Sequence, residues 1–197
     1  LDQPVIVRYV KYMGGMLHGD MGVSYVSKTD VFDTYMEKLP ATIKLSFASI
    51  LVSILLSVPL GIYSATRQGT VQDNISMIVA MIGLSMPNFW LGLLLIIVFS
   101  LNLGWFPSGG DQTLSSIVLP AITIGTGLMA TLTRTTRSSM LDVLKQEYLR
   151  TARAKGIPEK IVITSHALRN ALIPIITIIG TQLAGVLGGS VLTCLLY

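Results

Sequence analysis

Long uncharged hydrophobic segments constrain this chain more than any other feature of its sequence. Charged residues are absent from 22 residues at Leu45–Thr66, 27 at Ile75–Leu101, 17 at Ile117–Thr133 and 28 at Asn170–Tyr197. A helix needs about 20 apolar residues to cross roughly 30 Å of hydrocarbon. Backbone N–H and C=O groups cannot stay unpaired in lipid, so these segments should be helices and not open strands. We therefore predict four membrane-spanning helices, the third of them continuing into basic residues near the membrane surface.

The composition also indicates a membrane protein. Charged residues make up 12% of the chain, and mean hydropathy is +0.68, whereas soluble domains carry about 25% charged residues. The net charge of +4 could suggest a nucleic-acid partner. The basic residues, however, cluster in one loop beside apolar spans, as cytoplasmic loops of membrane proteins do, so we expect no nucleic acid. The single cysteine, Cys194, excludes an internal disulfide framework.

That loop sets the predicted orientation. Between Arg134 and Arg169 the chain holds eight Lys and Arg residues against three acids. Loops rich in Lys and Arg stay in the cytoplasm, so we place Arg134–Arg169 inside and Asn102–Ser116 outside. Alternation then places Arg67–Asn74 inside and residues 1–40 outside.

Both ends of the chain look cut. It begins with Leu1, with no charged-then-apolar leader, so no signal peptide is visible. It ends at Tyr197 inside an apolar run. We therefore expect the chain to be part of a longer protein.

The basic loop has the pattern of a helical hairpin. Tyr148, Leu149 and Ala152 recur on one helical face. Gly156 suits the end of that helix because glycine adopts a left-handed conformation freely, and Pro158 suits the first turn of a second helix. The pattern predicts helix, sharp turn, helix. A basic amphipathic loop resting on anionic lipid headgroups is the alternative.

Glycine and proline interrupt the spans, and most of them fit ordinary packing of membrane helices. Pro87 differs, because it combines a helix break with polar neighbours near the middle of a span. The residues that we predict to line a translocation path are Ser85, Met86, Pro87 and Asn88.

Several motifs together resemble a known family. They read EYLRTARAKG from Glu147, HALRNALIP from His166, GDMGVS from Gly19, LPAT from Leu39, SMPNFWLG from Ser85 and LGWFPSGG from Leu103. In this order they closely resemble permeases of ABC importers, and more narrowly the dipeptide, oligopeptide and nickel permease family.

The resemblance implies the fold class and the domain organisation. The fold would be an all-α, polytopic membrane helical bundle, the transmembrane domain of a type I ABC importer with short cytoplasmic coupling helices. Four spans of an expected six are visible, and the last helix is missing. An extracytoplasmic lead-in (1–38) would precede the permease domain (39–197), with spans near 41–66, 75–101, 117–140 and 170–197 and a coupling loop at 141–169.

The resemblance also implies function and partners. The chain would form half of a translocation pathway for peptides, or for nickel, in the cell membrane. Its partners would be ATP-binding subunits, a second, homologous permease, an extracytoplasmic substrate-binding protein and the lipid bilayer. ATP hydrolysis would take place on the partner subunits, so this chain would be no enzyme and would need no cofactor.

The loop would reach the ATP-binding subunit through a coupling helix. Ala152 and Gly156 would be small so that the helix seats closely, and Arg150, Arg153 and Lys155 would pair with acids of the partner. The residues assigned to the coupling surface are Glu147, Tyr148, Leu149, Arg150, Thr151, Ala152, Arg153, Lys155 and Gly156.

Two stretches depart from the family pattern. The general coupling consensus has Glu-Ala-Ala where this chain has Arg150-Thr151-Ala152, a variant usual in the peptide subfamily. After Thr193 the family continues with Glu and an aromatic-rich segment, whereas this chain reads Cys194-Leu195-Leu196-Tyr197. The resemblance therefore extends over roughly residues 5–193.

Other functions find less support in the sequence. A secondary transporter or channel driven by an ion gradient is the main alternative, but such proteins use ionisable residues within the membrane, and the four segments hold none. An intramembrane enzyme lacks an acid–base pair, and there is no G-x-x-x-x-G-K-[ST] motif for ATP. His18 and His166 are isolated, so no metal site is expected; we expect His166 to make a structural polar contact at the base of the hairpin.

Overall fold

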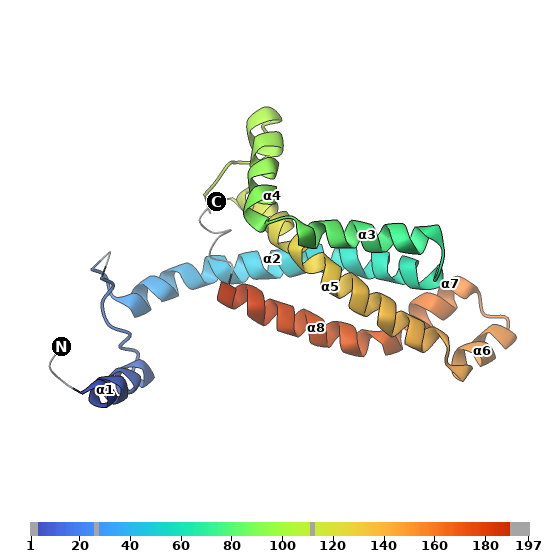
Figure 1. Cartoon of the computed structure of the whole chain (residues 1–197), viewed down its shortest axis with the longest axis horizontal. Coiled ribbons are helices and arrows are strands. Elements are labelled where there is room, and N and C mark those ends of the chain that lie inside the picture. Colours follow the sequence, from blue (N-terminus) through green and yellow to red (C-terminus); the bar gives the residue numbers. More distant parts are fainter. Residues whose placement is uncertain (1–3, 26–27, 111–112, 190–197) are drawn as a thin grey trace. The chain divides into compact units, whose positions relative to one another are not determined.

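The computed structural model describes residues 4–25, 28–110 and 113–189, most of which are helical (Figure 1). Within these ranges, β pairing is limited to an antiparallel bridge between Val23 and Asp30. The predicted all-α class is therefore confirmed. In chain order the elements are α1 (Val5–Leu17), α2 (Val31–Thr66), α3 (Val71–Ser85), α4 (Asn88–Leu95), the π-helix η1 (Ile96–Asn102), the 3₁₀ turn η2 (Leu114–Ile117), α5 (Val118–Leu144), α6 (Glu147–Ala154), α7 (Glu159–Ile161), the π-helix η3 (Val162–Ala167) and α8 (Leu168–Gly189).

The chain divides into two compact units, Leu1–Lys44 and Leu45–Tyr197, and the boundary falls inside α2. In the first unit, the carboxylate of Asp30 accepts hydrogen bonds from the backbone N–H groups of Phe32 (2.8 Å) and Asp33 (3.3 Å). Such bonds satisfy N–H groups that have no partner within the first turn of a helix. The helix therefore starts at Val31, ahead of the predicted start near residue 41, and takes in the end of the predicted lead-in.

The second unit is organised around α5, which lies between α3 and α8 and packs against both (Figure 1). α5 is also the most buried of the long apolar helices. Small residues bring α2 close to it: a Cβ atom added at Gly125 would lie 2.8 Å from the carbonyl oxygen of Ser49. The Ser57 hydroxyl donates a hydrogen bond to the Met129 carbonyl across the same interface. Such close approach is typical of packing between membrane helices.

Three helical segments are long and apolar enough to cross a membrane: Val31–Thr66, Leu114–Leu144 and Glu159–Gly188. The predicted spans 41–66 and 117–140 lie within the first two. Residues 170–188 of the predicted fourth span lie in the third, and residues 190–197 lie outside the described part of the chain.

The predicted span 75–101 is different. It is divided between α3 and the α4–η1 segment, which meet at 95°. The sequence predicted one span with a helix break at Pro87, and the 95° bend makes this pair either a broken span or a re-entrant loop.

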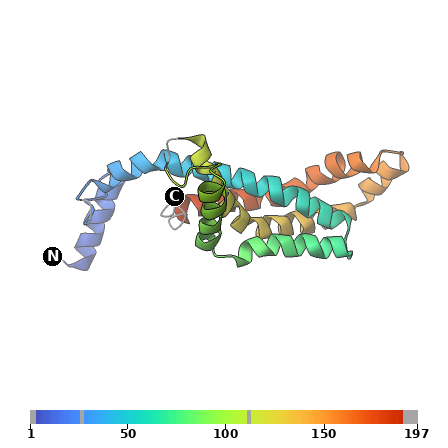
Figure 2. The ribbon, with the colours of Figure 1, turned by 90° about the horizontal axis from the view of Figure 1, so that it is seen from above.

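Both views of the second unit place the α6–α7 hairpin at the end of the bundle where α2 turns into α3 (Figures 1 and 2). The loop after Thr66 and the basic loop therefore lie at one end. This agrees with the prediction that Arg67–Asn74 and Arg134–Arg169 share one side of the membrane.

Apolar side chains cover the outside of the second unit. On α2, Phe47, Leu51 and Leu55 are exposed at a spacing of four residues, which is one helical face. On α8, Ile173 and Ile176 are also exposed. In water such faces would be unfavourable, whereas in a bilayer they contact lipid tails of similar polarity.

Candidate functional site

Helix α6 is the predicted coupling helix, and its C-terminal end has the geometry that the sequence indicated. Gly156 has a φ of +75°, and its N–H donates to the Arg153 carbonyl (2.9 Å) while the Ile157 N–H donates to the Ala152 carbonyl (3.4 Å). These two bonds form a Schellman motif, which ends a helix through a left-handed residue. A Cβ atom at Gly156 would meet nothing within 4 Å. Within this chain, glycine is therefore needed for the backbone conformation and not for close packing.

Pro158 lies one residue earlier than predicted, at the N-cap of α7 and not in its first turn. Its carbonyl accepts hydrogen bonds from the N–H groups of Ile161 (2.8 Å) and Val162 (3.1 Å). The π-helix η3 and then α8 follow without a break in the helical path. The chain thus forms a hairpin with α6 as its first arm, as the sequence predicted.

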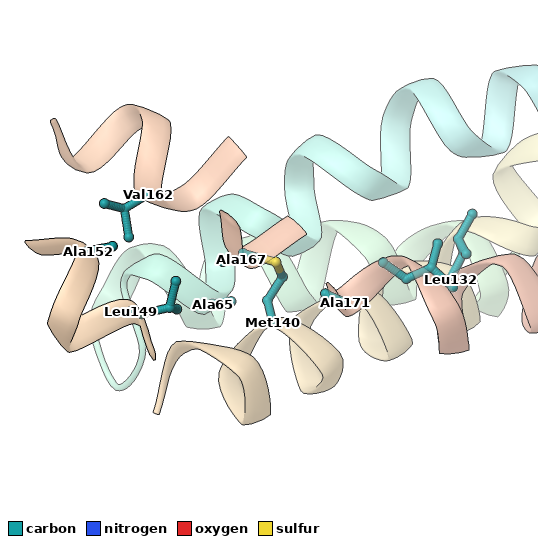
Figure 3. Packing of buried hydrophobic residues seen from close by; sticks show 9 residues of the cluster. Ala65, Leu132, Met140, Leu149, Ala152, Val162, Ala167 and Ala171 are labelled. Atoms are coloured by element: carbon teal, nitrogen blue, oxygen red, sulfur yellow. The ribbon is translucent and has the colours of Figure 1, made fainter. Parts of the chain in front are cut away.

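One face of α6 is buried against its own chain. Leu149 and Ala152 belong to a core cluster with Ala65, Met140 and Val162 (Figure 3). The picture shows Val162 above Ala152 and Leu149 near Ala65. The small side chain of Ala152 therefore faces the interior of the chain. Within the chain, this position makes the small size of Ala152 a matter of internal packing, and its expected role in seating the helix on a partner stays a prediction.

The opposite face of α6 is charged and exposed. Arg150 forms an ion pair with Glu147 (2.8 Å). The guanidinium of Arg153 donates two hydrogen bonds to the carboxylate of Glu159, at 3.0 Å from Nε and 2.9 Å from Nη2. These bonds raise the pKa of Arg153 above its usual value. Both arginines thus have partners within the chain, whereas the prediction gave them partners on another subunit.

Lys155 and Thr151 complete this face, and both are exposed. The hydroxyl of Thr151 donates to the Glu147 carbonyl (3.3 Å). Lys155 forms no ion pair with any residue in the described part of the chain. The charged face of α6, which we call the α6 cationic face, consists of Glu147, Arg150, Thr151, Arg153 and Lys155.

Tyr148 links the hairpin to the membrane helix that follows it. Its hydroxyl donates to the His166 carbonyl (3.3 Å) and accepts a hydrogen bond from the side-chain amide of Asn170 (2.7 Å). This contact uses the backbone carbonyl of His166, so the predicted polar contact of the His166 side chain stays a prediction. Through this contact, a displacement of α6 would act on Asn170, near the start of α8.

The predicted translocation residues form the corner between α3 and α4. α3 ends at Ser85, Met86 caps it, and Pro87 precedes the first residue of α4, Asn88. The Pro87 carbonyl accepts hydrogen bonds from the N–H groups of Trp90 (3.0 Å) and Leu91 (3.1 Å), which start the new helix in a new direction.

This corner lies against the middle of α5. A Cβ atom at Gly127 would lie 2.9 Å from the side-chain oxygen of Asn88, and one at Gly83 would lie 2.6 Å from the Thr126 carbonyl oxygen. The side chains of Ser85, Pro87 and Asn88 are exposed and that of Met86 is half-buried. The corner therefore presents two polar side chains at its surface.

Sequence reasoning missed an ion pair that joins three helices. Asp73, in the first turn of α3, accepts hydrogen bonds from Nε (2.8 Å) and Nη2 (2.7 Å) of Arg137 on α5. It also accepts from the hydroxyl of Ser64 on α2 and from the Gly69 N–H (3.0 Å). The sequence gave one signal: Asp73 follows Thr70 at the spacing of a helix start, and Thr70 does accept from the Asp73 N–H.

Among the described residues, no three His, Cys, Asp or Glu side chains gather at a spacing that could hold a metal ion. The polar features of this part of the chain are thus the α6 cationic face, the α3–α4 corner and the Asp73–Arg137 pair. The first two are exposed, whereas the pair is largely buried.

Comparison with known proteins gives these features a context. The family described as "Binding-protein-dependent transport system inner membrane component" matches residues 57–197. The oligopeptide transport system permease protein AppB of Bacillus subtilis (strain 168) is 46% identical over 202 residues, which cover 97% of this chain and 64% of that protein. The glutathione transport system permease protein GsiC of Escherichia coli (strain K12) is 40% identical over 191 residues, covering 97% of this chain and 62% of that protein.

The chain therefore spans less than two thirds of the length of these relatives. Its match to the family extends from α2 to Tyr197 and includes the α3–α4 corner, the Asp73–Arg137 pair and the α6–α7 hairpin. The resemblance found in the sequence is confirmed, and it places the chain among multi-pass membrane transport components and not among enzymes. The chain belongs to the family of inner-membrane components of binding-protein-dependent transport systems.

Proposed function

We propose that this chain is a permease subunit of an ATP-driven importer and that it forms half of the translocation pathway. The observation that carries the proposal is the construction of α6. One face of this short helix is fixed in the core of the chain by Leu149 and Ala152, and the other presents charge at the end of the bundle. A helix that is anchored and exposed in this way suits the transfer of force from another protein.

The proposed partner at this surface is an ATP-binding subunit. It would contact the α6 cationic face, while Leu149, Ala152 and Gly156 keep the helix in position from within the chain. A second, homologous permease and a substrate-binding protein would complete the assembly. Coupling then requires that the two states of the ATP-binding subunit contact α6 with different free energies.

The proposed cargo is a peptide. Two relatives are named for oligopeptide and glutathione transport, and both cargoes are peptides. These names favour a peptide over nickel. Ser85, Met86, Pro87 and Asn88 would line the path, because the α3–α4 corner exposes the polar side chains of Ser85 and Asn88 beside α5.

Gly156→Val tests the coupling role in the assembled transporter. Valine resists a φ of +75°, so this variant should distort the end of α6 without creating a clash. Substrate-stimulated ATP hydrolysis and uptake should fall together, while membrane insertion stays normal. Gly104→Val is the matched control, because Gly104 also has a positive φ (+65°) and open space around its Cβ position but lies in another loop. Normal coupling in Gly156→Val would contradict the proposal.

A further inference from the structure

Helix α1 in the first unit is amphipathic, and the function proposed above does not use it. Two adjacent stripes form its apolar face. One consists of Ile6, Val10, Met13 and Leu17, and the other of Val5, Tyr9, Tyr12 and Met16, each at the i, i+4, i+7, i+11 spacing of a helix. Arg8, Lys11 and Gly15 form the opposite face, and the sequence of the helix contains no acid.

This apolar face is fully open in the structure. Val5, Ile6 and Leu17 are exposed to 79%, 77% and 84%, and α1 has no buried residue. A face of this kind must be covered by lipid or by protein, because exposed apolar surface is unfavourable in water. With 13 residues it is about 20 Å long and cannot cross the roughly 30 Å of hydrocarbon.

The geometry points to the surface of the lipid bilayer as that cover: we propose that α1 lies in the membrane interface, on the side where α2 begins, with its apolar face toward the acyl chains. Only the segment from His18 to Asp30 separates α1 from α2, which is a candidate membrane span. The uncharged part of α2 begins at Leu45, and residues 31–44 of the helix lead about 20 Å away from it. The 13 residues from His18 to Asp30 can extend over about 40 Å, so α1 can return to the membrane surface.

The charges and aromatic residues of α1 suit this position. Arg8 and Lys11 lie opposite the apolar stripes, where they would meet anionic headgroups, and a basic polar face opposite an apolar one is typical of interfacial helices. Tyr9 and Tyr12 belong to the residue type that gathers at the membrane–water boundary. Met13 and Met16 add flexible apolar side chains that can follow the irregular surface between lipids.

An open hollow of about 610 Å³ lies beside the cationic face of α1. Arg8, Lys11, Tyr12 and Gly15 line it from the helix, and Asp20 and Gly22 line it from the following loop. The carboxylate of Asp20 is engaged by the Gly22 N–H (2.9 Å). The hollow leaves Arg8 and Lys11 open to groups that approach the polar side of the helix.

Site-directed spin labelling of the full chain in lipid nanodiscs tests this proposal. In a Cys194→Ser background, single labels are placed at neighbouring positions by Val10→Cys on the apolar face and Lys11→Cys on the cationic face. Oxygen concentrates in lipid, whereas a water-soluble nickel chelate stays outside. In nanodiscs that contain phosphatidylglycerol, the label at position 10 should collide severalfold more often with oxygen than with the chelate, and the label at position 11 should show the reverse.

Two results at position 10 would overturn the proposal. Equal access of the chelate to both labels would place α1 in water. Exclusion of both reagents from position 10 would place the apolar face against protein.

Replacing phosphatidylglycerol by phosphatidylcholine tests the role of Arg8 and Lys11. The preference for oxygen at position 10 should fall, because the attraction to anionic headgroups is lost. An unchanged preference would overturn the assignment of these two cations to the headgroups. The readout needs no ATP-binding subunit, so it is independent of the coupling role of α6.

Discussion

Asp73 is the residue on which the helix arrangement at the hairpin end depends most directly. Its carboxylate accepts four hydrogen bonds, from Arg137 (two), Ser64 and Gly69, and its side chain is 3% exposed. Reading the sequence did not reveal this, because Asp73 and Arg137 lie 64 positions apart. In the sequence, Asp73 and Arg137 belonged to two separate predicted loops. The packing of α3 on α5 brings their side chains together. Local signals sufficed for Gly156, whose left-handed conformation follows from its neighbours in sequence.

We expect Asp73→Asn to destabilise the bundle by about 1–3 kcal/mol, because the half-buried guanidinium of Arg137 (27% exposed) loses its charged hydrogen-bond partner. Thermal unfolding of the purified chain in detergent measures the effect. Asp142→Asn is the control, because Asp142 is an exposed acid on the same helix as Arg137, and exposed sites usually tolerate such changes. Equal stability of the two variants would contradict the structural role of Asp73.

At the scale of elements, the sequence predicted the ends of helices better than the angles between them. Pro87 indicated a break, and the break is present, but its angle of 95° could not be foreseen. That angle depends on contacts with α5, where Gly127 leaves room for Asn88 and Gly83 lets α3 approach Thr126. The hairpin was predictable because Gly156 and Pro158 act on the backbone locally. Of the three residues predicted on the apolar face of α6, Leu149 and Ala152 are buried. Tyr148 is exposed, and its hydroxyl is hydrogen-bonded to Asn170.

Two helical glycines, Gly61 at the α2–α5 interface and Gly180 on α8, should respond differently to replacement by alanine. Gly61→Ala should destabilise the bundle by about 1–3 kcal/mol by overpacking, because the new Cβ would lie 2.6 Å from the Cβ of Thr136. Gly180→Ala, on an open face of α8, should be neutral or stabilise the chain by up to about 1 kcal/mol, because alanine favours a helix. Unfolding in detergent compares the two variants. A Gly61→Ala variant as stable as Gly180→Ala would contradict this packing.

For the whole molecule, the absence of charge from the four uncharged apolar segments bears on the source of energy. Asp73 and Arg137 are the buried charges that the structure adds, and they neutralise each other at the end of the bundle where the hairpin lies. A fixed pair of this kind is a structural contact. It does not supply the unpaired ionisable group within the membrane that an ion-driven carrier uses.

Uptake should therefore continue when ion gradients are removed. In proteoliposomes that hold the complete transporter and a constant ATP concentration, ionophores that dissipate proton and sodium gradients should leave the initial rate of peptide uptake unchanged. Omission of ATP is the control and should stop uptake. Loss of uptake with the ionophores would favour the gradient-driven alternative.

The ion pairs of α6 have a consequence for how a neighbour can hold this helix. Because Arg150 and Arg153 already engage Glu147 and Glu159, an acid of a docking partner would compete with these carboxylates, and where it displaces one of them, one pairing replaces another. Exposed pairs of this kind contribute only about 0–1 kcal/mol each, and the displaced glutamates become available to cations of the newcomer. The bound and unbound states of the helix then differ little in electrostatic free energy. In the proposed assembly, such a contact with the ATP-binding subunit would be made and broken in every transport cycle.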